Sequence, residues 1–237
     1  MKPSVHAVIH HLDTTTTLRN AFLAWDHGFS GVFLISMSGD DAEIVIPARI
    51  IKEWHDTIRK RNWYGGRFRV GINFLAAPST VAVNVAMAHG LDSVWVDNPG
   101  VSSEGYDLEA QAELRKYTDA ARHANPLFEF YGSVAFKTQT IDLDPASAAL
   151  TATSLGWIAT TSGPFTGVAP DVDKLIVMRN TSKYLAVASG VNPDNVGAIS
   201  KHVDEILVNT GISRDFHNFD PEKMKALINN LGDKEEV

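Results

Sequence analysis

The sequence predicts one domain of the α/β class, a single (β/α)8 or TIM barrel, and three observations favour this fold. Short apolar runs rich in Val, Ile and Phe recur along the 237 residues, and most are continuous, as in parallel strands covered on both faces. Segments with the apolar spacing of helices separate them. The runs begin about 20 to 37 residues apart, which is the length of one strand–helix unit. A doubly wound open sheet is the alternative, because alternation alone does not prove closure.

Eight strands are expected, each an apolar run bounded by turn residues or polar residues. They cover residues 5–10, 31–36, 68–75, 93–97, 127–136, 156–161, 185–189 and 205–209. Eight strands that each precede a helix are the inventory of a barrel.

Helices are indicated by apolar side chains three and four residues apart. They lie at residues 18–25, 50–58, 81–89, 108–121, 146–155, 196–202 and 224–231. The last has the clearest start, because Asp220 can accept from free backbone N–H groups and Pro221 suits the first turn. The first and third end at Gly28 and Gly90, within similar segments, and a looser copy ends at Gly156. Glycine at such positions adopts the left-handed conformation that closes a helix.

Composition excludes several classes of protein. Hydrophobic residues make up 44% and charged residues 21%, a globular balance that disordered chains lack. The chain has no cysteine, which removes disulfides, thiolate metal sites and cysteine nucleophiles. The formal charge is -7, and no basic run beyond residues 59–61 would attract nucleic acid.

No linker or shift in composition divides the chain. One domain over residues 1–232 is therefore expected, followed by a frayed tail at residues 233–237. The start of the sequence lacks the apolar stretch of a signal peptide, and no apolar run approaches the roughly 20 residues of a membrane helix. These features predict a cytoplasmic protein with no membrane partner.

Glycine loops follow the last two predicted strands, where barrels commonly bind phosphate. The segments are Ala-Ser-Gly-Val-Asn-Pro at residues 188–193 and Asn-Thr-Gly-Ile-Ser at residues 209–213. Glycine lets backbone N–H groups approach an anion, although both glycines could simply make tight turns. The candidate binding residues here and at the ends of other strands are Ser189, Gly190, Thr210, Gly211, Asn73, Thr161 and Gly163.

Three ionisable residues are candidate catalytic groups at strand ends. Asp97 follows an apolar strand, and partial burial would raise its pKa and suit a general acid or base; a structural role in capping the next turn is the alternative. Lys137 could form a Schiff base or hold a phosphate, or be an ordinary solvated lysine. His10 could shuttle protons or pack as a core residue, and only one of His10 and His11 can face the barrel axis.

The sequence requires no metal or cofactor. It contains neither His-x-His nor His-Glu-x-x-His, the spacings that hold zinc. Asp13, Asp40 and Asp41 follow the first two strands, and their carboxylates could hold a magnesium ion.

Five segments of the sequence resemble the BtpA/SgcQ family. They are residues 8–10 (Val-Ile-His), 70–73 (Val-Gly-Ile-Asn), 161–167 (Thr-Ser-Gly-Pro-Phe-Thr-Gly), 188–196 (Ala-Ser-Gly-Val-Asn-Pro-Asp-Asn-Val) and 205–213 (Glu-Ile-Leu-Val-Asn-Thr-Gly-Ile-Ser). The resemblance spans nearly the whole chain, and the part from the sixth strand onward is specific. It implies a (β/α)8 barrel with a phosphate-type site at Ser189, Gly190, Thr210 and Gly211. It implies no settled reaction.

The sequence departs from that family at two places. His11-Leu12-Asp13 and four threonines replace a proline-rich loop, and Lys137-Thr138 stands where a Lys-His pair is expected. The seventh strand also resembles the phosphate-binding turn of phosphoribosylanthranilate isomerases. Those enzymes use a cysteine base on the first strand, near the place of His10 here, so this resemblance concerns the phosphate site alone.

Two functions fit these observations. The first is an isomerase-like or lyase-like enzyme that acts by proton transfer on a small phosphorylated metabolite: a sugar phosphate, a phosphoribosyl compound or a nucleotide. The second is a non-catalytic barrel that serves in assembly or ligand binding. Convergent polar residues at the strand ends favour the enzyme. An aromatic patch at Trp54, Trp63 and Tyr64 would favour the second function, or form a contact between copies in a homo-oligomer.

Overall fold

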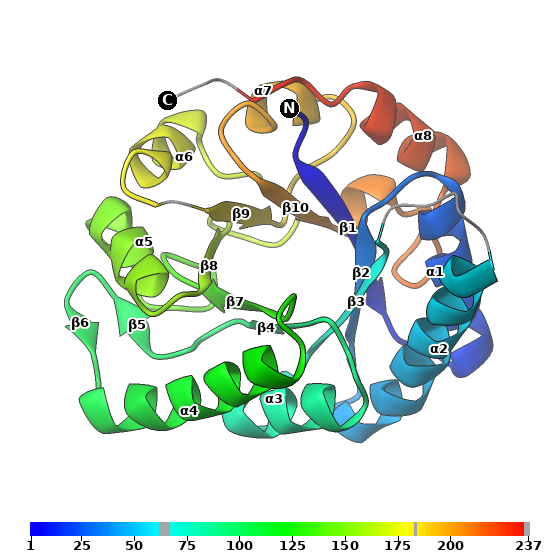
Figure 1. Ribbon diagram of the computed structural model, residues 1–237. Helices are drawn as coiled ribbons and strands as arrows, with labels where there is room; N and C mark the ends of the chain where they lie inside the picture. The colour runs from blue at the N-terminus through cyan, green and yellow to red at the C-terminus, as the bar shows by residue number, and fades with distance from the viewer. Residues whose placement is uncertain (62–66, 183, 235–237) are drawn as a thin grey trace.

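Eight parallel strands close into a barrel in the computed structural model, which describes residues 1–61, 67–182 and 184–234 (Figure 1). In chain order the strands are β1 (Ser4–His10), β2 (Gly31–Ile35), β3 (Arg69–Asn73), β4 (Ser93–Val96), β7 (Glu129–Ser133), β8 (Ile158–Thr161), β9 (Leu185–Ala188) and β10 (Glu205–Val208). Strand β10 pairs with β1 and so closes the sheet. The predicted (β/α)8 barrel is confirmed, and the open sheet is excluded.

Helices surround the strands (Figure 1). They are α1 (Thr14–Asp26), α2 (Val45–Arg61), α3 (Ser79–Ala88), α4 (Leu108–Ala124), α5 (Pro145–Ser154), α6 (Val172–Arg179), α7 (Val196–Ile199) and α8 (Pro221–Asn229). Aspartates accept from first-turn N–H groups in several of them: Asp13 in α1, Asp107 in α4, Asp144 in α5 and Asp220 in α8. These carboxylates satisfy donors that have no partner inside the helix.

Some elements differ from the sequence-based expectation. Helix α6 was not expected, because only Leu175 and Met178 of its side chains are buried and two such positions leave a weak helical pattern. Helix α1 begins earlier than expected, at the threonine run, and α2 begins at Val45, before the expected segment at residues 50–58. A small hairpin, β5 (Val101–Ser102) and β6 (Gly105–Tyr106), occupies the connection from β4 to α4. Helix α7 is shorter than expected.

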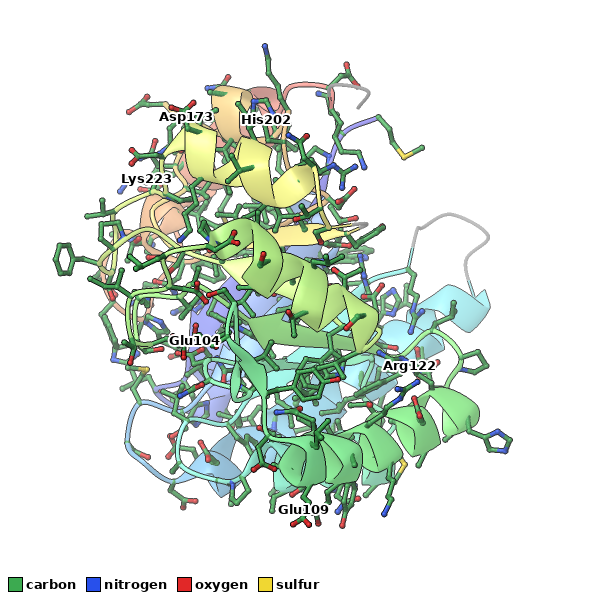
Figure 2. All side chains as sticks on the ribbon, turned by 90° about the vertical axis from the view of Figure 1, so that its left-hand side faces the viewer. Glu104, Glu109, Arg122, Asp173, His202 and Lys223 are labelled. Atoms are coloured by element: carbon green, nitrogen blue, oxygen red, sulfur yellow. The ribbon has the colours of Figure 1, made fainter. Side chains whose placement is uncertain are left out.

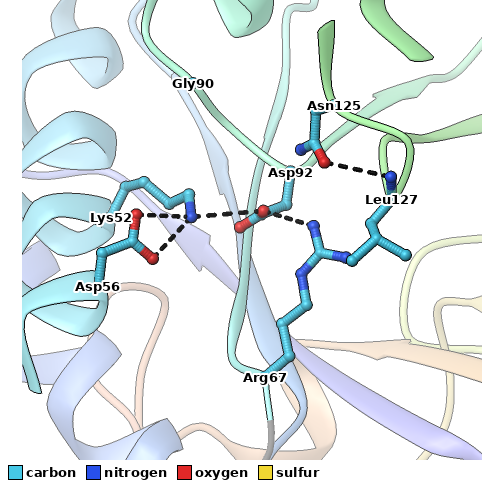
Figure 3. Close-up of a pocket in the computed structure, with 7 residues that line it drawn as sticks. All are labelled: Lys52, Asp56, Arg67, Gly90, Asp92, Asn125 and Leu127. Carbon is cyan, nitrogen blue, oxygen red and sulfur yellow. Dashed lines mark hydrogen bonds and ion pairs between the residues drawn. The ribbon is translucent and has the colours of Figure 1, made fainter. Parts of the chain in front are cut away.

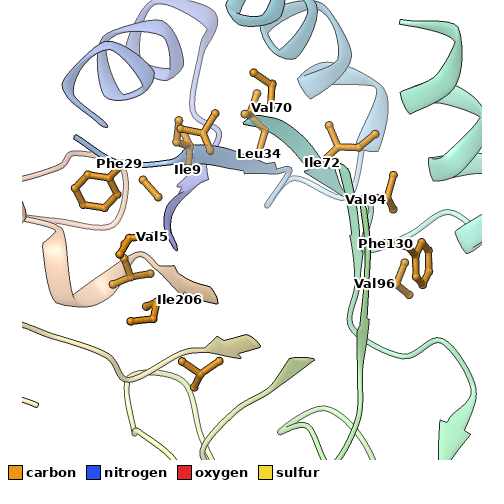
Figure 4. Close-up of a cluster of buried hydrophobic side chains, with 14 of the residues drawn as sticks. Val5, Ile9, Phe29, Leu34, Val70, Ile72, Val94, Val96, Phe130 and Ile206 are labelled. Carbon is orange, nitrogen blue, oxygen red and sulfur yellow. The ribbon is translucent and has the colours of Figure 1, made fainter. Parts of the chain in front are cut away.

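Alternate side chains of each strand point to two different cores. Val5 and Ile9 of β1, Leu34 of β2 and Ile72 of β3 belong to the large cluster between the strands and the helices (Figure 4). Val8, Phe33, Trp95, Tyr131 and Leu207 form a second cluster inside the barrel. Because every strand buries both faces, its sequence is a continuous apolar run.

Charged side chains fill the amino end of the barrel interior. The Arg69 guanidinium contacts the carboxylates of Glu129 and Glu205, at 3.0 Å from Nη2 to Oε1 of Glu205. Nε2 of His6 lies 2.6 Å from Oε2 of Glu205, and the Tyr131 hydroxyl donates to Glu129 over 3.1 Å. Burial, with Glu205 and Glu129 nearby, raises the pKa of Tyr131 well above its usual value. We call these five residues the barrel-floor network.

The two described ends of the chain lie side by side (Figure 1). The amino group of Met1 lies 3.3 Å from the Asp233 carboxylate, and the Lys234 N–H donates to the Met1 carbonyl over 3.1 Å. Residues 235–237 of the predicted tail lie outside the described residues, as do Trp63 and Tyr64 of the proposed aromatic patch. In the described ranges, no helix has the length and apolar character to cross a membrane.

Replacing Arg69 by Met is expected to lower the free energy of unfolding by about 3–5 kcal/mol, because two carboxylates would lose their shared cation inside the barrel. Urea denaturation at pH 7 measures the change. The matched control is Arg49→Met on α2, where the guanidinium and its partner Glu53 are both exposed and the change should stay within about 0.5 kcal/mol. A loss below about 1 kcal/mol for Arg69→Met would contradict the importance of the network.

Candidate active site

A cavity of about 280 Å³ opens at the carboxyl ends of the strands, where barrel enzymes carry their active sites. Its lining residues come from every part of the rim: Val8, His10, Ile35, Met37, Leu75, Trp95, Asp97, Lys137, Thr166, Ser189, Leu207, Asn209, Thr210 and Phe216. In the side view of Figure 2, Lys223 and Glu104 lie toward this face and Arg122 toward the opposite one. Five of the predicted site residues, His10, Asp97, Lys137, Ser189 and Thr210, therefore share one cavity.

Asp97 follows β4 and is held from two sides. Asn73 Nδ2 donates to Oδ1 of Asp97 over 2.9 Å, and Gln139 Nε2 donates to its main-chain carbonyl over 3.0 Å. Burial raises the pKa of Asp97, while the Asn73 amide and the charge of Lys137 act in the opposite direction. A fixed carboxyl with a raised pKa is suited to proton transfer. Asn73, a predicted binding residue, thus lies behind the cavity wall and orients Asp97.

Lys137 follows β7 and lies close enough to Asp97 for their charges to interact. Its Nζ donates to Thr166 Oγ1 over 3.2 Å, and its backbone N–H donates to Ser162 Oγ over 2.9 Å. Burial lowers the pKa of Lys137, and the charge of Asp97 opposes that shift. A lowered pKa increases the neutral amine fraction that nucleophilic chemistry requires.

A strained residue positions Lys137. Ala135 has φ 47, a left-handed conformation that costs a residue with a Cβ about 1–2 kcal/mol. Its carbonyl accepts from Lys174 Nζ over 2.7 Å and from Thr161 Oγ1 over 3.2 Å, and Lys174 also donates to the Ser162 carbonyl over 2.8 Å. Thr161 therefore supports the segment before Lys137 rather than lining the cavity. Lys174 lies in the helix that the sequence pattern missed, and no motif marked it.

His10 faces the cavity, whereas His11 points toward α1 and lies 2.8 Å from Thr17 Oγ1. The His10 ring packs against Phe216 with ring centroids 4.4 Å apart, and its buried Nδ1 has no hydrogen-bond partner in the described part of the chain. Burial lowers the pKa of His10 to about 4; a hydrogen bond with the Phe216 backbone opposes this shift, and the nearby Lys137 charge adds to it. At neutral pH the ring is therefore uncharged.

A second depression, of about 540 Å³, adjoins the cavity at Thr210. It is lined by Gly167, Gly190, Val191, Asn192, Pro193, Asp194, Thr210, Gly211 and Lys223. The backbone N–H groups of Gly190, Val191, Thr210 and Gly211 donate to no acceptor within the described ranges. Lys223 of α8 adds a cation near them, held by a 2.7 Å bond from Nζ to the Ser213 carbonyl.

The glycines here have a packing role that the sequence did not reveal. A Cβ at Gly190, whose φ is +73, would overlap the backbone of Val168 and Ala169, and a Cβ at Gly211 would overlap the Val191 carbonyl. Glycine is therefore required because neighbouring loops touch at these points. At Gly163 a Cβ would likewise overlap Val168 and Ala169, so this predicted binding residue closes its own loop.

Ser189 joins the same loops. It has φ 81, a left-handed value that is unusual for a residue other than glycine. Its Oγ accepts from the Gly167 N–H over 3.2 Å and donates to the Phe165 carbonyl over 3.4 Å. The loop after β8 is thus held over the cavity by Ser189 from β9 and by Thr166 bonded to Lys137.

The carboxylates suggested for magnesium already serve the backbone. Asp13 caps α1 and Asp40 accepts from the Ala42 N–H. Asp41 accepts from the N–H groups of Leu75, Ala76 and Ala77 over 2.8–3.0 Å. Across the described residues, no group of three or more His, Cys, Asp or Glu side chains is arranged to hold a metal.

A further depression, of about 550 Å³, lies at the amino ends of the strands, and none of the predicted site residues lines it (Figure 3). Its charges pair with each other: Arg67 Nη2 donates to Asp92 over 2.7 Å, and Lys52 Nζ contacts both Asp56 and Asp92. In a barrel, residues at this face serve stability. The candidate site is therefore the cavity at the carboxyl ends.

The matches found for this chain are among solved structures. No protein-family profile and no curated protein sequence matches the chain. Among solved structures, phosphoribosyl anthranilate isomerase from Thermotoga maritima is similar with a TM-score of 0.65 and 15% identity, over 96% of this chain and 98% of that one. The isomerase from Thermus thermophilus gives 0.63 and 13%, over 96% and 97%.

Thiamine phosphate pyrophosphorylase from Pyrococcus furiosus is also similar, with a TM-score of 0.60 and 15% identity over 96% of this chain and 94% of that one. At such identities these likenesses establish the (β/α)8 fold alone. The names of these similar proteins refer to a phosphate or phosphoribosyl compound.

His10 is expected to make folding sensitive to mild acid. Between pH 6.5 and about 4 the unfolded chain binds a proton at this position that the folded protein excludes, so the free energy of unfolding falls as the pH falls, by up to about 1.4 kcal/mol per pH unit. Urea denaturation across this range should show a shallower pH slope for His10→Gln. The control is His89→Gln at an exposed position. Equal slopes for both variants would contradict a buried neutral His10.

Lys174 is expected to keep the segment before Lys137 in place. The Lys174→Met variant loses the hydrogen bond that holds Ala135 in its strained conformation. Hydrogen exchange of the Lys137 backbone N–H should therefore accelerate about tenfold or more. Adding Ala135→Gly should reduce that effect, because glycine adopts the same φ without strain. Nuclear magnetic resonance measures the exchange, with exposed Lys225→Met as the control. Equal exchange in the single and double variants would contradict the strain argument.

Proposed function

We propose that this protein is an enzyme that binds a small phosphorylated metabolite across the two adjoining depressions and acts on it by proton transfer. The observation that carries the proposal is the arrangement at the rim. One depression holds Lys223 and four backbone N–H groups that have no acceptor among the described residues, and the next holds Asp97 with Lys137. Thr210 lines both, so one molecule can reach from the first to the second.

The phosphate is assigned to the loops after β9 and β10. Backbone N–H groups suit phosphate oxygens because they carry partial positive charge and need acceptors. Gly190, Val191, Thr210 and Gly211 offer such groups, and the Lys223 ammonium adds a full charge. This placement agrees with the phosphate-type site implied by the BtpA/SgcQ resemblance and with the phosphoribosyl and phosphate compounds in the names of the structural neighbours.

The reacting end of the metabolite is assigned to Asp97 and Lys137. The Asp97 carboxylate, with its raised pKa, can take a proton from a carbon next to a carbonyl group and return it to the neighbouring carbon. The Lys137 ammonium would stabilise the negative charge that develops on the carbonyl oxygen. Its lowered pKa also permits an imine with the carbonyl carbon, with loss of water, which a lyase would use. The proposed class is therefore isomerase or lyase.

His10 is assigned a contact with the reacting end. With a pKa of about 4 it is neutral at pH 7, so it can donate or accept one hydrogen bond without adding charge. A neutral ring leaves Lys137 as the main cation beside Asp97 in the described cavity.

Binding of inorganic phosphate and of phosphorylated metabolites tests the first part. Thermal shift should show an increase in Tm with ligand concentration, and Thr210→Glu should abolish it by placing a carboxylate among the N–H groups. The matched control is Thr140→Glu, an exposed threonine on another part of the rim. Gly190 is unsuitable for this purpose, since any side chain there overlaps the neighbouring loop.

Turnover measurements test the proposed proton transfer by Asp97 and Lys137. Ligands that bind are incubated with the protein in heavy water, and phosphorus and proton resonance follow isomerisation, cleavage and solvent proton exchange. Asp97→Asn and Lys137→Met should each reduce kcat by about 10²-fold or more. Borohydride trapping of a Lys137 adduct would select the lyase. No binding of any phosphorylated compound would overturn the proposal and favour a non-catalytic barrel.

A further inference from the structure

The cavity rim has two chemically different halves. Around the barrel, β4, β7, β8, β9 and β10 are followed by the polar lining residues Asp97, Lys137, Thr166, Ser189, Asn209 and Thr210. The side formed by β1, β2 and β3 contributes Val8, Ile35, Met37 and Leu75, with Phe216 packed against His10 of β1. Among the described lining residues, His10 is the polar side chain on that second half, and it is uncharged at pH 7. We call β1, β2, β3 and Phe216 the apolar half.

The apolar half presents large side chains to solvent. Met37 is 46% exposed, Leu75 48% and Phe216 49%. Trp95 and Leu207 form the floor beneath them, and the Trp95 indole N–H is already satisfied by Ser133 Oγ at 2.9 Å. Apolar side chains grouped around one opening mark a ligand surface rather than random exposure.

Two of these side chains stand on loops fixed by hydrogen bonds. The Asp41 carboxylate accepts from the Leu75, Ala76 and Ala77 N–H groups. The loop that carries Phe216 is held where Asn20 Nδ2 donates to the His217 carbonyl over 2.7 Å and where the His217 ring meets the His10 carbonyl at 3.1 Å. Loops held in this way lose little freedom when a ligand binds, so the surface is preorganised.

The volume of the cavity limits the size of the ligand. A cavity of about 280 Å³ is near the lower limit of roughly 300 Å³ for small-molecule sites, so it holds one ring or one short chain. A polyhydroxylated chain would set hydroxyl groups against Met37, Leu75 and Phe216, and each buried hydroxyl without a partner weakens binding. A flat ring would instead stack on Phe216 and cover the apolar floor.

We propose that the substrate is a phosphate monoester with a flat, largely apolar ring at the end away from the phosphate, and that Met37, Leu75 and Phe216 select for that ring. This inference rests on the proposed function, since it takes the phosphate to occupy the loops after β9 and β10. It narrows the substrate class to phosphate monoesters that carry a ring, and it excludes simple sugar phosphates.

The test compares three probes by isothermal titration at fixed salt: inorganic phosphate, ribose 5-phosphate and phenyl phosphate. Phenyl phosphate should bind at least tenfold more tightly than ribose 5-phosphate. Phe216→Ala should weaken phenyl phosphate binding fivefold or more and leave inorganic phosphate unchanged. The matched control is Phe165→Ala, a 71% exposed phenylalanine that does not line the cavity. Met37→Ser is a second variant, which is exposed enough to leave folding intact.

The outcomes separate the two proposals. If ribose 5-phosphate binds as well as phenyl phosphate, or if Phe216→Ala and Met37→Ser leave the preference unchanged, ring selection is overturned while the phosphate site stands. If none of the three probes binds, or Thr210→Glu does not reduce binding, the phosphate site itself is overturned. Ring selection is supported if the tenfold preference for phenyl phosphate over ribose 5-phosphate is lost in Phe216→Ala and kept in Phe165→Ala.

Discussion

The ion pairs of the Arg69 guanidinium are the interactions that connect the strands at the amino end of the closed barrel. It lies between Glu129 of β7 and Glu205 of β10, and Glu205 also meets His6 of β1. One cation from β3 therefore links strands on opposite sides of the axis at the amino end. Charged groups and Tyr131 fill that end of the barrel, and the cavity at the carboxyl end has a floor of Trp95 and Leu207. The barrel-floor network and the candidate active site thus lie at opposite ends of the barrel, as stability and active-site residues do in this fold generally.

Much of the fold was predictable because each strand buries both faces and so leaves a continuous apolar run in the sequence. All eight runs coincide with strands of the barrel; β1 begins one residue before its run, and the other strands are shorter than their runs by one to five residues. Helix α6 could not be predicted, since only two of its side chains reach the core. Asp97, Lys137 and His10 were identifiable because polar residues directly after an apolar run mark strand ends. Lys174 and Phe216 were not, because their importance comes from contacts with Ala135 and His10 that sequence distance hides.

Glycine at positions 190 and 211 is expected for phosphate loops, but packing between neighbouring loops also requires it. Gly190 and Gly211 follow β9 and β10, as expected for phosphate loops. The position that a Cβ would occupy at each glycine, however, is filled by the backbone of the neighbouring loop. Both glycines also line the depression beside Lys223, and their N–H groups donate to no acceptor in the described part of the chain. Packing between loops therefore requires these glycines whether or not the proposed phosphate binds there, and the glycine pattern alone does not show this packing.

The contacts among these loops have a consequence for local unfolding. The loop after β8 touches Gly190 and Ser189 of the loop after β9, which in turn touches Gly211 after β10. Because the loop after β9 contacts both of the others, its opening would remove contacts from all three segments at once. A molecule bound at the middle loop would therefore restrict the opening of both neighbouring loops through these contacts, with no change required in the average shape.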